Sequence, residues 1–87
     1  MNKYYVYVLK CRDDTLYTGI TTDLEQRLTK HNEGIGAKYT RGRTPVKLMY
    51  YESGYTKSEA LKREIAIKKL TRIKKEKLIK DFKDTKK

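Results

Sequence analysis

The 87-residue sequence contains one cysteine, one proline, one phenylalanine and no tryptophan. Because Cys11 stands alone, an internal disulfide and a zinc site built on cysteines are excluded, and a reducing, cytoplasmic location is expected. The longest uncharged stretches, Tyr4–Leu9 and Thr15–Thr22, are far shorter than the ~20 residues that a membrane span requires. We therefore expect neither a membrane segment nor a secretory signal.

Acidic residues are also scarce, since 11 Asp and Glu stand against 22 Lys and Arg, for a net charge of +11. The excess is concentrated in residues 62–87, which hold twelve basic and four acidic residues. A field of this sign attracts polyanions, and nucleic acid is the commonest polyanion that a small protein meets. The alternative is that lysine-rich helices are merely solvated, but the clustering of charge favours nucleic-acid contact.

The chain is short enough to form one domain over residues 1–87, with a core from about residue 4 to 82 and a frayed basic tail at 83–87. Hydrophobic periodicity, turn residues and two capping boxes, at Thr22/Glu25 and Thr56/Glu59, predict the elements. The expected strands are 4–10, 16–21 and 46–53, and alternation along the last one puts Leu48 and Tyr50 on the same face. The expected helices are 23–33, 56–70 and a last one after Thr71. The order ββαβαα predicts the α+β class, with a small antiparallel sheet flanked by helices.

The first two strands place tyrosines on one face of a hairpin. A three-residue turn at 12–14 puts Leu9 opposite Tyr17 and Tyr7 opposite Gly19, so the two tyrosines are diagonal neighbours. Gly19 leaves a hole beside both phenols, which suits a pocket floored by two hydroxyls. The alternative is that both rings are core residues with their hydroxyls at the rim, and this geometry alone does not choose between the two.

The expected helix 23–33 carries Arg27 and His31 four residues apart, hence on one face, beside the apolar stripe that should pack on the sheet. The guanidinium of Arg27 keeps its charge and its fork matches a phosphate. His31 is the only histidine, and the alternative interpretation is that it is a solvated helix residue without a role in the site.

Glu64 falls in the apolar stripe of the expected helix 56–70, among Ala60, Leu61 and Ile67. A carboxylate there is costly unless it is paired or binds a cation. The alternative is an ion pair with Lys68 one turn away, worth about 0.3–0.5 kcal/mol, which would fit better on an exposed face.

At these residues the chain resembles the GIY-YIG nuclease family. Tyr5-Val6-Tyr7 stands where that family has GIY, and Tyr17-Thr18-Gly19 stands where it has YIG. Arg27 with His31 four residues later, and Glu64 in a downstream helix, follow the same pattern. The resemblance extends from residue 4 to about 70 and is greatest to short stand-alone members of the family.

The resemblance implies an α/β sandwich around a three-stranded antiparallel sheet and a divalent-metal phosphodiesterase. It implies that Tyr7 and Tyr17 are active-site phenols, that Arg27 binds phosphate, that His31 lies near the attacking water, and that Glu64 holds Mg²⁺ or Mn²⁺. A phenol is a poor base at neutral pH unless nearby cations favour phenolate. We favour Tyr17 as the base, with Tyr7 or His31 in support, although the sequence does not rank the two tyrosines firmly.

The glycine-rich loop 34–45 supplies further candidate nucleic-acid contacts, at Lys38, Tyr39, Arg41 and Arg43. Its cations suit phosphates rather than base edges, and Tyr39 could stack on an unpaired base. An ordinary surface loop is the alternative. We therefore expect a monomeric or weakly oligomeric endonuclease that acts on DNA with weak sequence preference, with structure-selective cleavage left open. The alternative function is a nucleic-acid-binding module on the same fold that cuts poorly or not at all.

Overall fold

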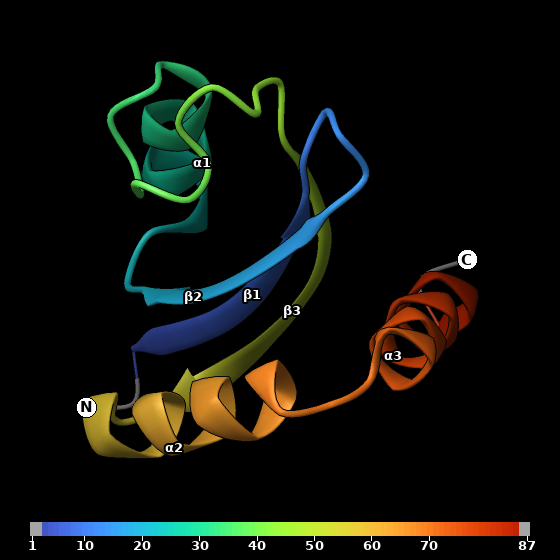
Figure 1. Cartoon of the computed structure of the whole chain (residues 1–87). Coiled ribbons are helices and arrows are strands. Elements are labelled where there is room, and N and C mark those ends of the chain that lie inside the picture. The colour runs from blue at the N-terminus through green and yellow to red at the C-terminus, as the bar shows by residue number, and fades with distance from the viewer. Residues whose placement is uncertain (1–2, 86–87) are drawn as a thin grey trace.

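A computed structural model describes residues 3–85 of the chain. Three strands form one antiparallel sheet with the order β2-β1-β3, and three helices pack around it (Figure 1). This confirms the predicted α+β class and the order ββαβαα. No helix within the described residues is long and apolar enough to cross a bilayer. The elements are β1 Tyr4–Lys10, β2 Leu16–Thr21, α1 Leu24–Asn32, β3 Lys47–Tyr55, α2 Lys57–Lys68 and α3 Arg72–Thr85.

The β1–β2 hairpin has the register that the sequence predicts. Tyr7 pairs with Gly19 and Leu9 pairs with Tyr17. The turn closes with a hydrogen bond of 2.8 Å from the Cys11 amide to the Thr15 carbonyl oxygen. Strand side chains alternate between faces. Because one residue more or less in the turn would reverse the faces, its length determines that the tyrosines share a face.

The sheet buries a different apolar cluster on each face. Val6 and Val8 of β1 pack with residues of α2 and α3, such as Ala60 and Ile79. The alternate residues of β1 pack on the other face against α1 and the chain that precedes β3. Figure 1 shows α1 and the following loop on one side of the sheet and α2 on the other, with α3 beside β3. The hairpin tyrosines therefore face α1.

Two local predictions about capping and strand alternation are corrected by the structure. The N-cap of α1 is Asp23, whose carboxylate accepts a hydrogen bond of 3.0 Å from the Gln26 amide, and Thr22 has no capping role. In β3 a bulge separates the Tyr50 pairing from the Leu48 pairing. Leu48 therefore packs on the α1 face and Tyr50 on the opposite face, whereas strict alternation had placed them together.

Other helix ends agree with the sequence. Thr56 and Glu59 form the expected capping box of α2, and Gly34 follows α1 with a φ of 81°. The expected fraying from residue 83 is not observed at 83–85, because α3 continues to Thr85. The Thr85 hydroxyl donates to the Asp81 carbonyl oxygen at 2.8 Å, which holds this last turn. Residues 86 and 87 lie outside the described residues.

Candidate active site

Tyr7, in the centre of β1, is the most buried of the candidate phenols, with 2% of its surface exposed. Its hydroxyl lies 3.0 Å from His31 Nε2 and accepts a long hydrogen bond of 3.4 Å from Arg27 Nε. Burial raises the pKa of Tyr7, and the hydrogen bond from Arg27 opposes that rise. The phenol is therefore protonated at neutral pH and lies between a fixed cation and an imidazole.

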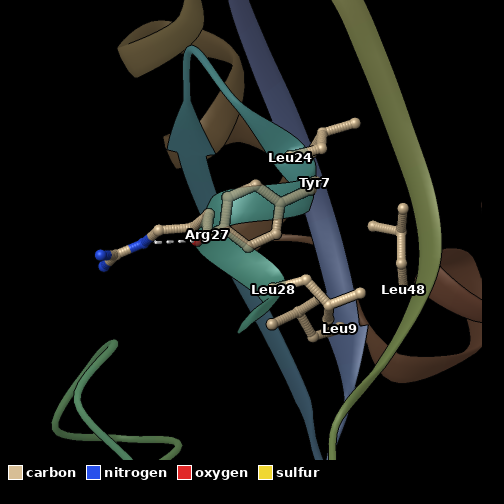
Figure 2. A pocket seen from close by; sticks show the side chains of 6 residues that line it. All are labelled: Tyr7, Leu9, Leu24, Arg27, Leu28 and Leu48. Atoms are coloured by element: carbon tan, nitrogen blue, oxygen red, sulfur yellow. Dashed lines mark hydrogen bonds between the residues drawn. The ribbon is translucent and has the colours of Figure 1, made fainter. Parts of the chain in front are cut away.

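Arg27 of α1 lies at the hydroxyl end of Tyr7, and Figure 2 marks the hydrogen bond between them with a dashed line. Besides its contact with Tyr7, it donates a bond of 3.4 Å from Nη2 to the Gly36 carbonyl oxygen. Both bonds are long, so the guanidinium is held in place without being saturated. The rest of the pocket that it shares with Tyr7 is apolar and supports the two polar groups, being lined by Leu9, Leu24, Leu28 and Leu48.

His31 is fully buried at the end of α1, so the alternative of a solvated helix residue is wrong. Its Nε2 contacts Tyr7 and its Nδ1 lies 2.7 Å from Thr40 Oγ1. Burial, with a further contribution from the Arg27 charge, lowers the pKa of His31 from 6.5 to about 4. The imidazole is therefore neutral at pH 7 and has one nitrogen able to accept a proton.

Gly19 provides the space that the Tyr7 hydroxyl occupies. A Cβ atom at this position would lie 2.6 Å from Tyr7 Oη and 3.1 Å from Cε2 of Tyr17. The first distance is shorter than real Cβ contacts, so the Tyr7 hydroxyl would have to shift, whereas the second is only tight. The centroids of the two tyrosine rings are 6.4 Å apart, as the hairpin register predicted for diagonal neighbours. Gly19 thus allows both phenols to approach one another at one point of the sheet.

Tyr17 forms the wall of the site toward the loop before β3. Its ring stacks on Tyr39 with a centroid distance of 5.7 Å and an interplanar angle of 27°. The guanidinium carbon of Arg43 lies 4.5 Å from the centroid of the Tyr39 ring, and Arg43 is tied to Asp13 at 2.7 Å. Tyr39 thus has both a ring and a guanidinium against it, while 42% of its surface stays exposed.

Glu64, on α2, has a side chain that is 18% exposed and pairs loosely with Lys68 at 3.7 Å. The ion pair considered as an alternative is thus present, but it is longer than a hydrogen bond. Its carboxylate charge contributes to raising the pKa of both Tyr7 and Tyr17, after the larger effect of burial. Glu64 therefore lies within electrostatic range of the paired phenols.

The remaining candidate contacts are exposed cations of the loop before β3. Within residues 3–85, the side chains of Lys38 and Arg41 form no hydrogen bond or ion pair. Arg43 differs, because Asp13 and Tyr39 engage it. Lys38 and Arg41 are therefore the two loop cations that can bind a phosphate at no cost in existing contacts.

Sequence reasoning missed two residues of the site. Thr40 is 1% exposed and bonds His31. Gly36 packs closely against the same imidazole, where an added Cβ would lie 2.5 Å from Nδ1. A glycine and a small hydroxyl residue in a polar loop are typical of a turn, so nothing in their spacing indicated a contact with a histidine several residues earlier. The only available signal was the density of glycines in the loop.

Comparisons with known proteins identify related chains. A family described as "GIY-YIG catalytic domain" matches residues 3–78. The chain is 58% identical over 79 residues to a UPF0213 protein of Staphylococcus saprophyticus, covering 91% of this chain and 96% of that one. It is also 58% identical over 78 residues to a UPF0213 protein of Natronomonas pharaonis, covering 90% and 92% of the two chains.

Solved structures show the same fold. The solution NMR structure of a UPF0213 protein from Bacillus halodurans has 49% identity and a TM-score of 0.57, covering 92% of this chain and 84% of that one. The solution NMR structure of a protein from E. faecalis has 49% identity and a TM-score of 0.60, covering 94% and 91%. The names of these relatives state no activity, so the family match is the functional evidence among the comparisons.

Proposed function

Because the chain belongs to the GIY-YIG family, a family of nucleases, we propose that it is a divalent-metal-dependent endonuclease that hydrolyses phosphodiester bonds of DNA. The observation that carries the proposal is the hydrogen-bonded series Arg27–Tyr7–His31, assembled from β1 and α1. Glu64 lies within electrostatic range of the same phenol. A phosphate-binding cation, a proton-transfer pair and a carboxylate are the groups that such hydrolysis requires.

The hydrogen bonds favour Tyr7 over Tyr17 as the group that activates water. A base must dispose of the proton that it receives or already carries, and His31 Nε2 lies 3.0 Å from the Tyr7 hydroxyl. The oxygen of Tyr7 takes a proton from water while its own proton passes to His31. Tyr17, the second phenol, orients the water from the other side. This reverses the order that the sequence favoured.

Arg27 supplies positive charge to the phosphate. Its Nε and Nη2 are already directed to Tyr7 and Gly36 by long bonds, which leaves Nη1 for a non-bridging oxygen. A guanidinium keeps its charge at any pH of interest, so it stabilises the charge that develops on the phosphorane.

Glu64 is the residue that would hold Mg²⁺ or Mn²⁺. Among residues 3–85, no group of three His, Cys, Asp or Glu side chains could hold a metal ion, so the fit is to a cation that keeps most of its water. A partly buried carboxylate with only a 3.7 Å ion pair to Lys68 suits that role. When bound, the metal would neutralise charge on the phosphate and on the leaving oxygen.

Weak sequence preference follows from the kind of contacts that the loop offers. Lys38 and Arg41 are exposed cations, which bind the backbone of any sequence. Selection for branched or single-stranded DNA would come from shape rather than from base edges. Monomeric protein suffices for this arrangement, because all the groups named come from one chain.

Cleavage of single-stranded, duplex and branched DNA by purified protein, with Mg²⁺, Mn²⁺ or EDTA, tests the proposal. We expect nicking that requires the metal and that falls by at least about 100-fold in Glu64→Gln and Tyr7→Phe. Tyr17→Phe is expected to lose activity as well. Salt-sensitive DNA binding should survive all three changes.

Tyr5→Phe and Glu76→Gln are the matched controls. Tyr5 lies on the same strand and contacts Tyr51 by ring packing, and Glu76 is an exposed carboxylate paired with Arg72 on α3. Both variants should cleave as the wild type does. Equal cleavage by wild type, Glu64→Gln and Tyr7→Phe would identify a contaminating nuclease. Binding without cleavage under every condition would assign the protein to the non-catalytic alternative.

A further inference from the structure

Thr40 belongs to the loop between α1 and β3 and is buried beside His31. Its hydroxyl oxygen lies 2.7 Å from His31 Nδ1, and the hydroxyl donates a hydrogen bond of 3.0 Å to the Ala37 carbonyl oxygen. Only 1% of Thr40 is exposed, so no bulk water competes for either bond. Thr40 thus bonds the nitrogen of His31 that does not contact Tyr7.

The proton of the Thr40 hydroxyl determines the tautomer of His31. A hydroxyl has one proton, and when that proton is donated to Ala37 the oxygen can offer only lone pairs to Nδ1. Nδ1 must then carry the imidazole proton. In a neutral ring Nε2 is consequently the acceptor, and the Tyr7 hydroxyl, 3.0 Å away, donates to it.

In the opposite tautomer, with the proton on Nε2, the hydrogen bonds of His31 to Tyr7 and to Thr40 would both have donor and acceptor exchanged. Nε2–H would donate to the Tyr7 oxygen, which already accepts from Arg27 Nε, and the phenolic proton would have to point away from His31. Thr40 would also have to withdraw its proton from Ala37 and donate it to Nδ1. Because Nε2 would already carry a proton, it could not accept the proton of Tyr7.

We propose that Thr40 is a positioning residue that holds His31 in the Nδ1–H tautomer, so that Nε2 stays available to accept the proton of Tyr7. Gly36 supports this role, because its bare Cα packs on the imidazole and any Cβ would lie 2.5 Å from Nδ1. The ring is therefore kept in the plane that both bonds need. The importance of this tautomer for cleavage rests on the function proposed above, whereas the tautomer itself does not.

Nuclear magnetic resonance of protein labelled with ¹⁵N-histidine measures the tautomer directly. His31 is the only histidine, so a single pair of ring nitrogens is observed. At pH 7 we expect the wild type to show a protonated Nδ1 and an unprotonated Nε2. Thr40→Val keeps the shape but removes the acceptor, and it should shift the ring to the Nε2–H form or to a mixture. Thr40→Ser should retain the wild-type pattern.

Steady-state cleavage provides the second readout. Thr40→Val should lower kcat about 10- to 100-fold with KM nearly unchanged, since the loop cations remain, while Thr40→Ser should stay within about threefold of wild type. An Nε2–H tautomer in the wild type would overturn the proposal, as would a Thr40→Val protein with wild-type tautomer and rate. If Thr40→Val does not fold, the wild-type spectrum alone decides. A wild type that shows the Nδ1–H form but never cleaves would disprove the proposed function and leave the role of Thr40 in setting the tautomer standing.

Discussion

At the scale of single residues, the candidate site depends on two glycines that leave no room for a Cβ atom and on the donor and acceptor roles in a few hydrogen bonds. Gly19 and Gly36 each lie where one added carbon would collide with a functional ring. Tyr7 and His31 are buried with their polar atoms bonded, and among the described residues no buried side-chain nitrogen or oxygen lacks a partner. These residues are therefore arranged for position as much as for packing.

Gly19→Ala should separate the geometry of the site from the stability of the fold. The new Cβ would lie 2.6 Å from Tyr7 Oη, so the hydroxyl must move away from His31. We expect cleavage to fall at least about 100-fold and stability to fall by about 1–3 kcal/mol, measured by nicking assays and urea melts. Gly54→Ala is the control, because Gly54 has a φ of 88° and no atom near its Cβ position. It should cost about 1 kcal/mol and leave cleavage unchanged.

The buried neutral state of His31 predicts how stability depends on pH. Its pKa is about 4 in the folded protein and about 6.5 when unfolded, so between these values the unfolded chain binds a proton that the folded chain does not. The contribution of neutral His31 to the free energy of unfolding is complete above pH 6.5 and is lost as the pH falls toward 4. We expect a loss of about 2 kcal/mol between pH 7 and 5, measured by urea unfolding. The free energy of unfolding of His31→Gln should hardly change between pH 7 and 5. A wild type whose stability is equally constant over this range would contradict the expectation.

At the scale of elements, the sequence predicted those features that depend on residues close together in the chain. The hairpin register follows from the spacing of Tyr7, Tyr17 and a three-residue turn, and the structure has that register. The bulge that separates Leu48 from Tyr50 had no such signal, because it depends on how β3 fits against β1. The contact between His31 and Thr40 is set by the fold of the intervening loop, which periodicity does not describe.

The start of α1 offers a direct test of the corrected cap. Asp23 accepts a hydrogen bond from the Gln26 amide, so Asp23→Ala should destabilise the protein by about 1 kcal/mol. Thr22, the cap that the sequence had favoured, has no side-chain hydrogen bond within the described part of the chain. Thr22→Ala should therefore stay within about 0.5 kcal/mol of wild type in thermal unfolding. Equal losses in the two variants would restore the original capping box.

A carboxylate network fixes α2 against β3 and so holds the helix that bears Glu64. Arg63 donates two hydrogen bonds of 2.8 Å to the Glu52 carboxylate, which also accepts from the hydroxyls of Tyr50 and Tyr55. Burial would raise the pKa of Glu52, but these hydrogen bonds outweigh it and lower the pKa. Glu52 therefore remains charged and ties α2 to β3.

At the scale of the whole molecule, the groups of the candidate site come from elements on opposite faces of the sheet. The phenols belong to the face under α1, whereas Glu64 comes from α2, which packs against the opposite face and contacts the edge strand β2 (Figure 1). Segments far apart in sequence must therefore fold together before Glu64 comes within electrostatic range of the phenols. A helical stripe could place Glu64 toward the sheet, but only the strand order brings it near the edge that carries Tyr17.

The net charge of +11 predicts strong salt dependence of DNA binding, and the loop cations allow its origin to be tested. Arg41 is exposed and has no side-chain partner among residues 3–85, so Arg41→Ala should lower the slope of log K against log salt by about one unit. Arg43 is already paired with Asp13 at 2.7 Å, so Arg43→Ala should change the slope by much less. Fluorescence anisotropy across salt concentrations measures both. A larger change in the Arg43 variant would mean that its pair with Asp13 opens on binding and that Tyr39 is uncovered for an unpaired base.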